Sequence, residues 1–167
     1  MSIENNVTRF ALIRHAETEW NRKKLIQGQK DSQLTKYGEG QARKWGRILE
    51  GHGIMRILSS DSERTMETAS LINLSLNIPL TWDFRLREQD WGLWTGMSLE
   101  DIKDKEPETF DRQIKAGWGF QPPGGEFRYT VCDRSCQAII DAGAKWPGEK
   151  ILIVTHEGVI KCIISDK

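Results

Sequence analysis

Long apolar segments are absent from this 167-residue chain. None of its apolar runs approaches the ~20 residues that a membrane-spanning helix needs. Residues 1–6 contain no basic region followed by an apolar stretch, so we expect no signal peptide. These features argue against a membrane-anchored or secreted protein.

Cysteine is scarce, with Cys132, Cys136 and Cys162 as its only occurrences. An odd and sparse set argues against a disulfide framework and fits a protein of the reducing cytoplasm. Cys132 and Cys136 are four residues apart and share one face of an expected helix. Two idle thiols explain this pair better than a metal site does.

The chain also has no net charge, because 24 acidic residues balance 24 basic ones. This balance argues against nucleic acid or an anionic membrane surface as a partner. Any positive field must therefore be local and made by a few placed arginines.

Short apolar runs alternate with helical patterns along the whole chain. Strands are predicted at residues 7–14, 56–60, 80–84 and 151–154. Helices are predicted at residues 38–49, from 98 to about 107, and at 127–146. Another helix is predicted to begin at one of the possible caps at 60–62 and to end before residue 77. Residues 17–32 are predicted to form a loop. This alternation predicts one domain, 1–167, with a three-layer α/β/α fold and a mostly parallel sheet.

Two histidines follow predicted strands. His15 comes directly after the first strand and His156 follows the last. Open α/β sheets bind their ligands at the carboxyl ends of the strands. Arg14 would favour the neutral form of the neighbouring imidazole and could hold a phosphate bidentately. By itself, the dipeptide is better explained as a solvated or salt-bridged strand end.

Two further segments carry candidate chemistry. Arg64 lies in the first turn of a predicted helix, where a cation is unfavourable unless the helix start faces an anion. By itself, Arg64 is better explained as a solvated surface residue. Within residues 86–96, acidic side chains lie among apolar and aromatic ones, which can raise a carboxyl pKa enough for general acid catalysis. Arg87, Glu88 and Asp90 are all candidates there.

Taken together, these segments resemble the histidine phosphatase superfamily, also called phosphoglycerate mutase-like. The family signature Arg-His-Gly-Glu-Thr-x-x-Asn corresponds to residues 14–21. Five further motifs match in family order, at Gln27 to Thr35, at Arg64 with Thr68 and Ala69, at Leu86 to Gly96, at Pro123 to Glu126, and at Val154 to His156. Any single match is weak, but six in order, at the expected strand and helix positions, are strong.

The resemblance implies a role for each matching residue. His15 would attack phosphorus and become phosphohistidine, while Arg14, Arg64 and a charged His156 would hold the phosphoryl oxygens. Glu88 would protonate the leaving oxygen and later deprotonate water. Further substrate-binding residues are expected at Thr18, Asn21, Gln27, Gly28, Arg87 and Glu157. No metal and no cofactor are expected, since the cations surround the phosphate instead.

The chain departs from the family pattern at three places. Ala16 replaces a usual glycine beside His15, and we expect a mild effect. Glu157 stands where glycine commonly follows the second histidine, and its side chain is expected to point away from phosphate. The chain stops at Lys167, so we expect either a shortened member or a missing C-terminal part.

The predicted function is hydrolysis of a small phosphorylated metabolite. The Leu86 to Gly96 run is closest in appearance to the α-ribazole phosphatase branch, and residues 88–125 are expected to cover the site. Trp91, Trp94, Trp118 and Phe120 would either line its mouth or pack in the core. Two alternatives remain open, a cofactor-dependent phosphoglycerate mutase and a catalytically weakened module that binds a phospho-ligand.

Overall fold

A four-stranded parallel sheet forms the centre of the fold. The computed structural model describes residues 7–165. Within this range the strands lie in the order β1 (Arg9–Arg14), β4 (Lys150–Thr155), β2 (Arg56–Ser59) and β3 (Leu80–Trp82). Each strand is parallel to its neighbour, so the carboxyl ends of all of them meet at one edge.

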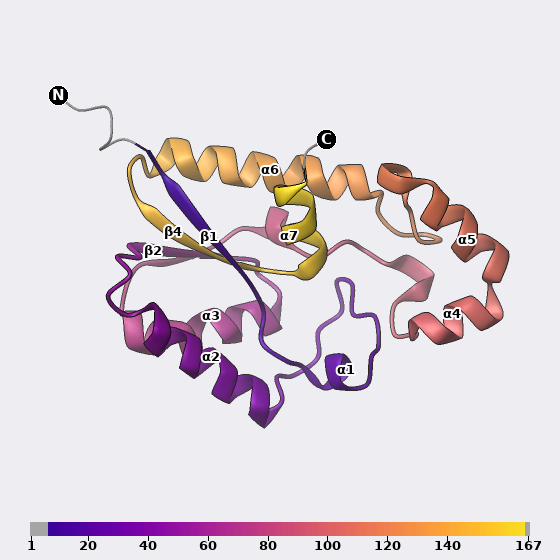
Figure 1. The fold of residues 1–167 in the computed structure, drawn as a ribbon, viewed down its shortest axis with the longest axis horizontal. Coiled ribbons are helices and arrows are strands. Elements are labelled where there is room, and N and C mark those ends of the chain that lie inside the picture. Colours follow the sequence, from indigo (N-terminus) through magenta and orange to yellow (C-terminus); the bar gives the residue numbers. More distant parts are fainter. Residues whose placement is uncertain (1–6, 166–167) are drawn as a thin grey trace.

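Helices cover both faces of the sheet, which confirms the predicted three-layer architecture. Helices α2 (Lys36–Leu49) and α3 (Glu63–Leu76) lie on one face. Helix α6 (Arg128–Lys145) lies on the other, with α7 (Glu157–Ile164) beside it (Figure 1). Parallel sheets need this double cover because both of their faces are apolar.

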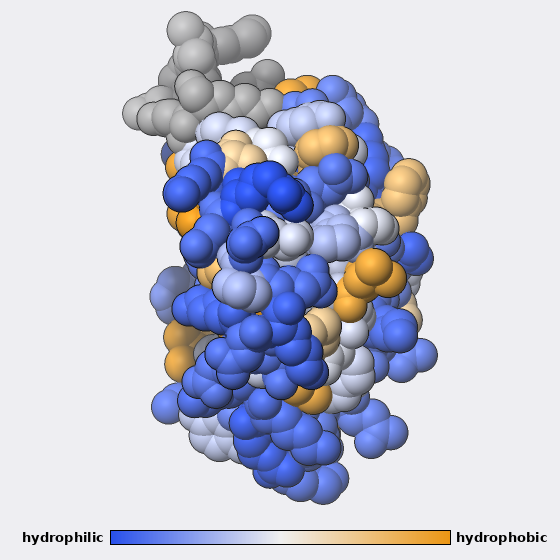
Figure 2. Space-filling view, turned by 90° about the vertical axis from the view of Figure 1, so that its right-hand side faces the viewer, coloured by the Kyte–Doolittle hydropathy of each residue, from blue (hydrophilic) through white to orange (hydrophobic). Residues whose placement is uncertain are grey.

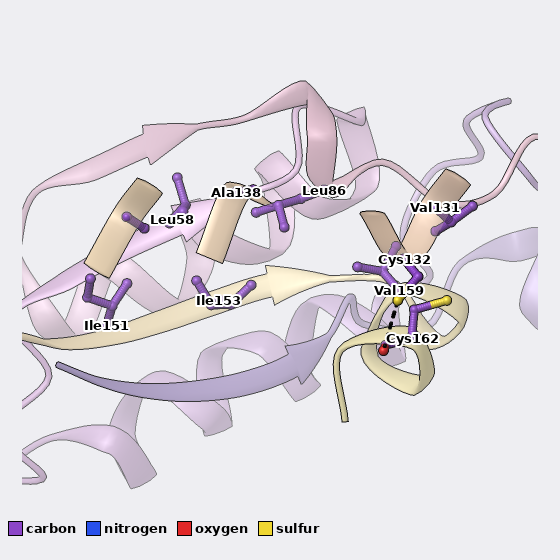
Figure 3. Packing of buried hydrophobic residues seen from close by; sticks show 10 residues of the cluster. Leu58, Leu86, Val131, Cys132, Ala138, Ile151, Ile153, Val159 and Cys162 are labelled. Atoms are coloured by element: carbon purple, nitrogen blue, oxygen red, sulfur yellow. Dashed lines mark hydrogen bonds between the residues drawn. The ribbon is translucent and has the colours of Figure 1, made fainter. Parts of the chain in front are cut away.

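The central strand β4 shows why the layers form. Its side chains alternate between the two faces, and five consecutive residues are buried. Ile151 and Ile153 join the cluster under α6 and α7 (Figure 3). Leu152 and Val154 join the cluster under α2 and α3. Burial on both faces therefore explains the continuous apolar run in the sequence.

Local capping chemistry sets several helix starts. Thr35 accepts a hydrogen bond from the backbone N–H of Gly38 at the start of α2. A capping box formed by Ser98 and Asp101 begins α4 (Leu99–Lys105). The expected loop at 17–32 contains a short helix, α1 (Glu19–Arg22), because Thr18 and Asn21 form a second capping box.

The segment after β3 departs from the predicted strand. The carboxylate of Asp83 accepts a hydrogen bond from the backbone N–H of Arg85. This cap turns the chain into a 3-10 helix, η2 (Phe84–Leu86), so the strand ends at Trp82. The turn directs the following residues back across the carboxyl edge of the sheet.

Residues 88–125 lie beyond that carboxyl edge (Figure 1). They contain the 3-10 helix η3 (Gly92–Trp94), helices α4 and α5 (Pro107–Lys115), and the 3-10 helix η4 (Gly117–Gly119). Their own apolar cluster is centred on Trp94, Ile102 and Phe120, so Trp94 packs in the core. The outer face at this end of the molecule is mostly hydrophilic, with isolated apolar residues (Figure 2). Within residues 7–165, helices that are both long and apolar enough to cross a bilayer are absent.

Candidate active site

The strand order places the two histidines side by side. The backbone N–H of His15 donates to the carbonyl of Thr155 across 2.9 Å, which extends the β1–β4 pairing by one residue. On the other side of β4, the N–H of Ser60 donates to the carbonyl of Val154. The rings of His15 and His156 are 5.4 Å apart between centroids and meet edge to face.

The ring of His15 is oriented by its neighbour. Its Nδ1 lies 2.8 Å from the carbonyl oxygen of Ala16, and a carbonyl can only accept, so Nδ1 carries the proton. The lone pair is therefore on Nε2, for which residues 7–165 offer no hydrogen-bond partner. Burial, together with the nearby charges of Arg64 and Arg14, lowers the pKa of His15 to about 3. The imidazole is thus neutral and has a free lone pair at physiological pH.

This lowered pKa predicts how stability depends on pH. In the unfolded chain His15 takes up a proton as the pH falls through 6.5, whereas the folded protein resists protonation down to about 3. Stability is therefore lost as the pH falls below 6.5, by about 1.4 kcal/mol per pH unit for this group. This loss is measured by comparing the free energy of unfolding in urea of wild type and His15→Asn between about pH 7 and pH 5. The wild-type decline should be steeper, and equal slopes would contradict the buried neutral ring.

His156 is held by two partners from the chain itself. Arg64 Nη2 donates to its Nδ1 across 3.1 Å, because a guanidinium cannot accept. The proton is therefore on Nε2, which donates to Ser60 Oγ at 3.1 Å. Burial, with the charge of Arg64 next, lowers the pKa of His156 well below its ordinary value. The expectation of a charged His156 was wrong, since the buried ring beside an arginine is neutral.

Arg64 is one of the largest fully buried side chains. Its Nη1 donates to the carbonyl of Lys30 and to Asp31 Oδ1, at 2.9 and 2.7 Å. Its Nη2 donates to the carbonyl of Gly28 at 2.7 Å and to His156. Its Nε is buried without a hydrogen-bond partner. The interpretation of Arg64 as a solvated surface residue was wrong, because the guanidinium ties the 28–31 loop to His156.

Arg14 forms an ion pair that the sequence did not suggest. Its Nη1 donates to Glu157 Oε2 across 2.6 Å, and both side chains are nearly half exposed. The other carboxylate oxygen of Glu157 accepts from Lys161 Nζ at 2.6 Å. The expectation that Glu157 points away was wrong. As the first residue of α7, Glu157 lies between Arg14 and Lys161 and forms a salt bridge with each of them.

Glu88 lies against the first turn of α7. Its Oε2 accepts from the backbone N–H of Gly158 at 3.2 Å, and its Oε1 accepts from the N–H of Gln89 at 2.9 Å. A Cβ on residue 158 would collide with this carboxylate, so a larger residue there would have to displace the Glu88 side chain. Burial raises the pKa of Glu88 despite these hydrogen bonds. A raised pKa suits a carboxyl group that donates a proton.

Arg134 of α6 holds the segment that carries Glu88. Its guanidinium donates to the carbonyl oxygens of Arg85, Arg87 and Glu88, at 2.6, 2.7 and 3.1 Å. It also forms a bidentate pair with Glu126, at 2.8 and 2.9 Å. This arrangement restricts the backbone on which Glu88 is mounted.

A cavity of about 900 Å³ opens over His15. Eight of the predicted site residues line it, namely Arg14, His15, Asn21, Gln27, Gly28, Arg64, Glu88 and Glu157. Its outer wall includes Trp91, Phe110, Trp118 and Phe120 from the covering segment, so three of the four expected aromatics do reach it.

Three predicted residues lie away from the cavity wall. Thr18 is fully buried, and its hydroxyl caps α1. Arg87 is exposed and forms a bidentate ion pair with Asp61. His156 is fully buried and contacts Arg64 and Ser60. The structure thus places Thr18 and His156 behind the site and Arg87 outside it.

Comparison with known proteins agrees with this geometry. The model of the histidine phosphatase superfamily (branch 1) matches residues 10–166. The chain belongs to this superfamily. The resemblance inferred from the six motifs is therefore confirmed.

Relatives within the histidine phosphatase superfamily carry different names. A probable phosphoglycerate mutase, GpmB, of Salmonella typhi is 37% identical over 92% of this chain and 72% of its own length. The structure of Bacillus stearothermophilus YhfR is 34% identical with a TM-score of 0.85, covering 95% of this chain and 78% of that one. The α-ribazole phosphatase of Shigella flexneri is 27% identical with a TM-score of 0.81, covering 92% and 76%.

Sequence reasoning missed three residues of this superfamily member's site. Asp31 and Ser60 hold Arg64 and His156, and Arg134 holds the Glu88 segment. Asp31 lies inside the matched Gln27 to Thr35 motif, which is a signal that could have identified it. Arg134 lies within α6, where the sequence provides no comparable signal.

Proposed function

We propose that this chain is a phosphatase that hydrolyses small phosphomonoesters through a phosphohistidine at His15. One observation carries the proposal. The neutral His15 ring exposes an unpaired Nε2 to a large cavity that also contains Arg14, Arg64 and a carboxyl group with a raised pKa. A nucleophile, cations for phosphoryl oxygens and a proton donor are the parts that phosphoryl transfer requires.

The first step forms an N–P bond from His15 Nε2 as the P–O bond to the leaving group breaks. Glu88 donates its proton to the leaving oxygen. Arg14 offers N–H groups to the phosphoryl oxygens, and Arg64 adds positive charge from behind. A proton donor at this position typically contributes ~10²–10⁴-fold in rate.

The second step returns the enzyme to its starting state. Glu88, now ionised, takes a proton from water as the water oxygen attacks phosphorus. The N–P bond breaks, its electrons return to Nε2, and inorganic phosphate leaves. Residues 88–125 would act as the cover that excludes bulk water during transfer. We place this activity in the cytoplasm because an odd and sparse set of three cysteines argues against a disulfide framework.

Phosphoglycerate mutase activity is the main alternative, and the name of the Salmonella typhi relative favours it. A mutase would transfer the phosphoryl group from phosphohistidine to a second position on the substrate, whereas a phosphatase transfers it to water. The Arg14–Glu157 ion pair favours a weakened phospho-ligand-binding module as a third possibility, since it occupies one of the cations.

One experiment separates the three functions. Purified protein is incubated with 4-nitrophenyl phosphate, or with 3-phosphoglycerate with and without 2,3-bisphosphoglycerate, and both free phosphate and 2-phosphoglycerate are measured. A phosphatase releases phosphate from the aryl ester and shows no bisphosphoglycerate-dependent formation of 2-phosphoglycerate. Fast isomerisation with negligible phosphate release would establish the mutase. Absence of both activities would leave the binding module.

A further inference from the structure

Glu157 occupies an unusual position for a carboxylate, beside a site built for phosphate. It is the first residue of α7, where the helix dipole stabilises its negative charge. Its two oxygens accept from Arg14 and Lys161, each at 2.6 Å. The hydrogen bond from Lys161 is the main cause that lowers the pKa of Glu157, which is therefore ionised at neutral pH.

Glu157 and Glu88 flank the same turn of α7. The N–H of Gly158, the residue after Glu157, donates to the Glu88 carboxylate. Both acidic side chains line the cavity over His15. Under the proposed function the leaving oxygen must approach Glu88 to receive a proton. The first atoms of the leaving group then lie next to this turn, within reach of the Glu157 charge.

The cations near Glu157 do not cancel its effect on an incoming anion. Arg14 and Lys161 are already bound to its carboxylate, so a second anionic group must compete for them. Lys24 and Arg128 also line the cavity, but neither pairs with Glu157. A leaving group that reaches Lys24 or Arg128 could pair its anionic group with one of them.

We propose that Glu157 is a specificity-determining residue, which selects phosphomonoesters whose leaving group has no carboxylate or second phosphate close to the ester oxygen. This inference rests on the proposed phosphatase function and deepens it. Like-charge juxtaposition is a common device for rejecting wrong ligands. It would also disfavour short polyanionic substrates of the kind that a phosphoglycerate mutase uses.

Two matched three-carbon ligands test the proposal. Glycerol 3-phosphate carries a hydroxymethyl group at the position where 3-phosphoglycerate carries a carboxylate. Their inhibition constants are measured against turnover of 4-nitrophenyl phosphate, and their dissociation constants by calorimetry in the His15→Ala background, where neither can be hydrolysed. With Glu157 in place, 3-phosphoglycerate should bind about tenfold more weakly than glycerol 3-phosphate. This ratio corresponds to a difference in binding free energy of ~1.4 kcal/mol.

The variant Glu157→Gln removes the charge and keeps the size of the side chain. It should improve 3-phosphoglycerate binding about tenfold relative to glycerol 3-phosphate, so that their ratio approaches one. Glu157→Asp, which keeps the charge, should retain most of the discrimination. Glu67→Gln on the exposed side of α3 is the matched control and should leave the ratio unchanged.

Three results would overturn the inference. The first is tighter binding of 3-phosphoglycerate than of glycerol 3-phosphate by wild type. The second is an equal change in the affinity for both ligands in Glu157→Gln. The third is a change in the affinity ratio with Glu67→Gln as large as that with Glu157→Gln. Failure of the proposed function looks different, since wild type would then release no phosphate from the aryl ester, or that release would survive His15→Ala. The calorimetric ratio still decides the role of Glu157 in that case.

Discussion

Replacing His15 by alanine is expected to lower kcat/KM for aryl phosphate by about 10⁴–10⁶-fold. The variant loses the lone pair on Nε2 that the Ala16 carbonyl orients toward the cavity. The remaining cations still bind phosphate, so the affinity for inorganic phosphate should change far less than the rate. Steady-state kinetics and calorimetric phosphate binding measure the two effects separately.

The chain provides its own control for this substitution. His52 is exposed and lies in the turn between α2 and β2, so His52→Ala should leave kcat/KM unchanged. Brief incubation with radiolabelled substrate should yield an acid-labile, alkali-stable phosphoprotein with wild type and His52→Ala, and none with His15→Ala. Thermal unfolding checks that the alanine variant still folds. Persistent turnover of aryl phosphate by folded His15→Ala would contradict the phosphohistidine mechanism.

Replacing Arg64 by methionine should damage both stability and activity. Methionine keeps part of the buried stem but leaves the carbonyl oxygens of Gly28 and Lys30 and His156 Nδ1 without the guanidinium that donates to them. Asp31 loses its cation and keeps only the backbone N–H groups of residues 63 and 64 as donors. Breaking a buried ion pair from one side typically costs about 3–5 kcal/mol. Urea unfolding should show a loss of that size. We expect kcat/KM to fall by about 10²–10³-fold because the cation behind the phosphoryl site is removed.

Two comparison variants make this result specific. Arg22→Met removes an exposed arginine that pairs with Glu19 within α1, and it should cost less than about 1 kcal/mol. The double variant Arg64→Met with Asp31→Asn removes the uncompensated carboxylate as well, so it should recover part of the lost stability but none of the activity. If Arg64→Met unfolds no more readily than Arg22→Met, the buried network does not contribute to stability as described.

The sequence alone predicted the architecture well because local rules control it. Alternation of apolar runs with capped helices placed the strands that became β1, β2 and β4, and the order of motifs identified the family. It also placed His15 and His156 at strand ends. Prediction was poorer where one local hydrogen bond changes the outcome, as at Asp83, whose cap ends β3 early.

What the sequence determined, then, is which chemical groups reach the carboxyl edge of the sheet. Only the tertiary structure decided their states, because those depend on partners distant along the chain. Strand order β1-β4-β2 joins Arg14 to Glu157 across 143 positions and Arg64 to His156 across 92. Those contacts and the accompanying burial make His156 neutral, anchor Arg64 behind the phosphoryl site and turn Glu157 toward Arg14 rather than away. Burial and charge are properties of the packed site as a whole, so no local pattern of residues could have revealed them.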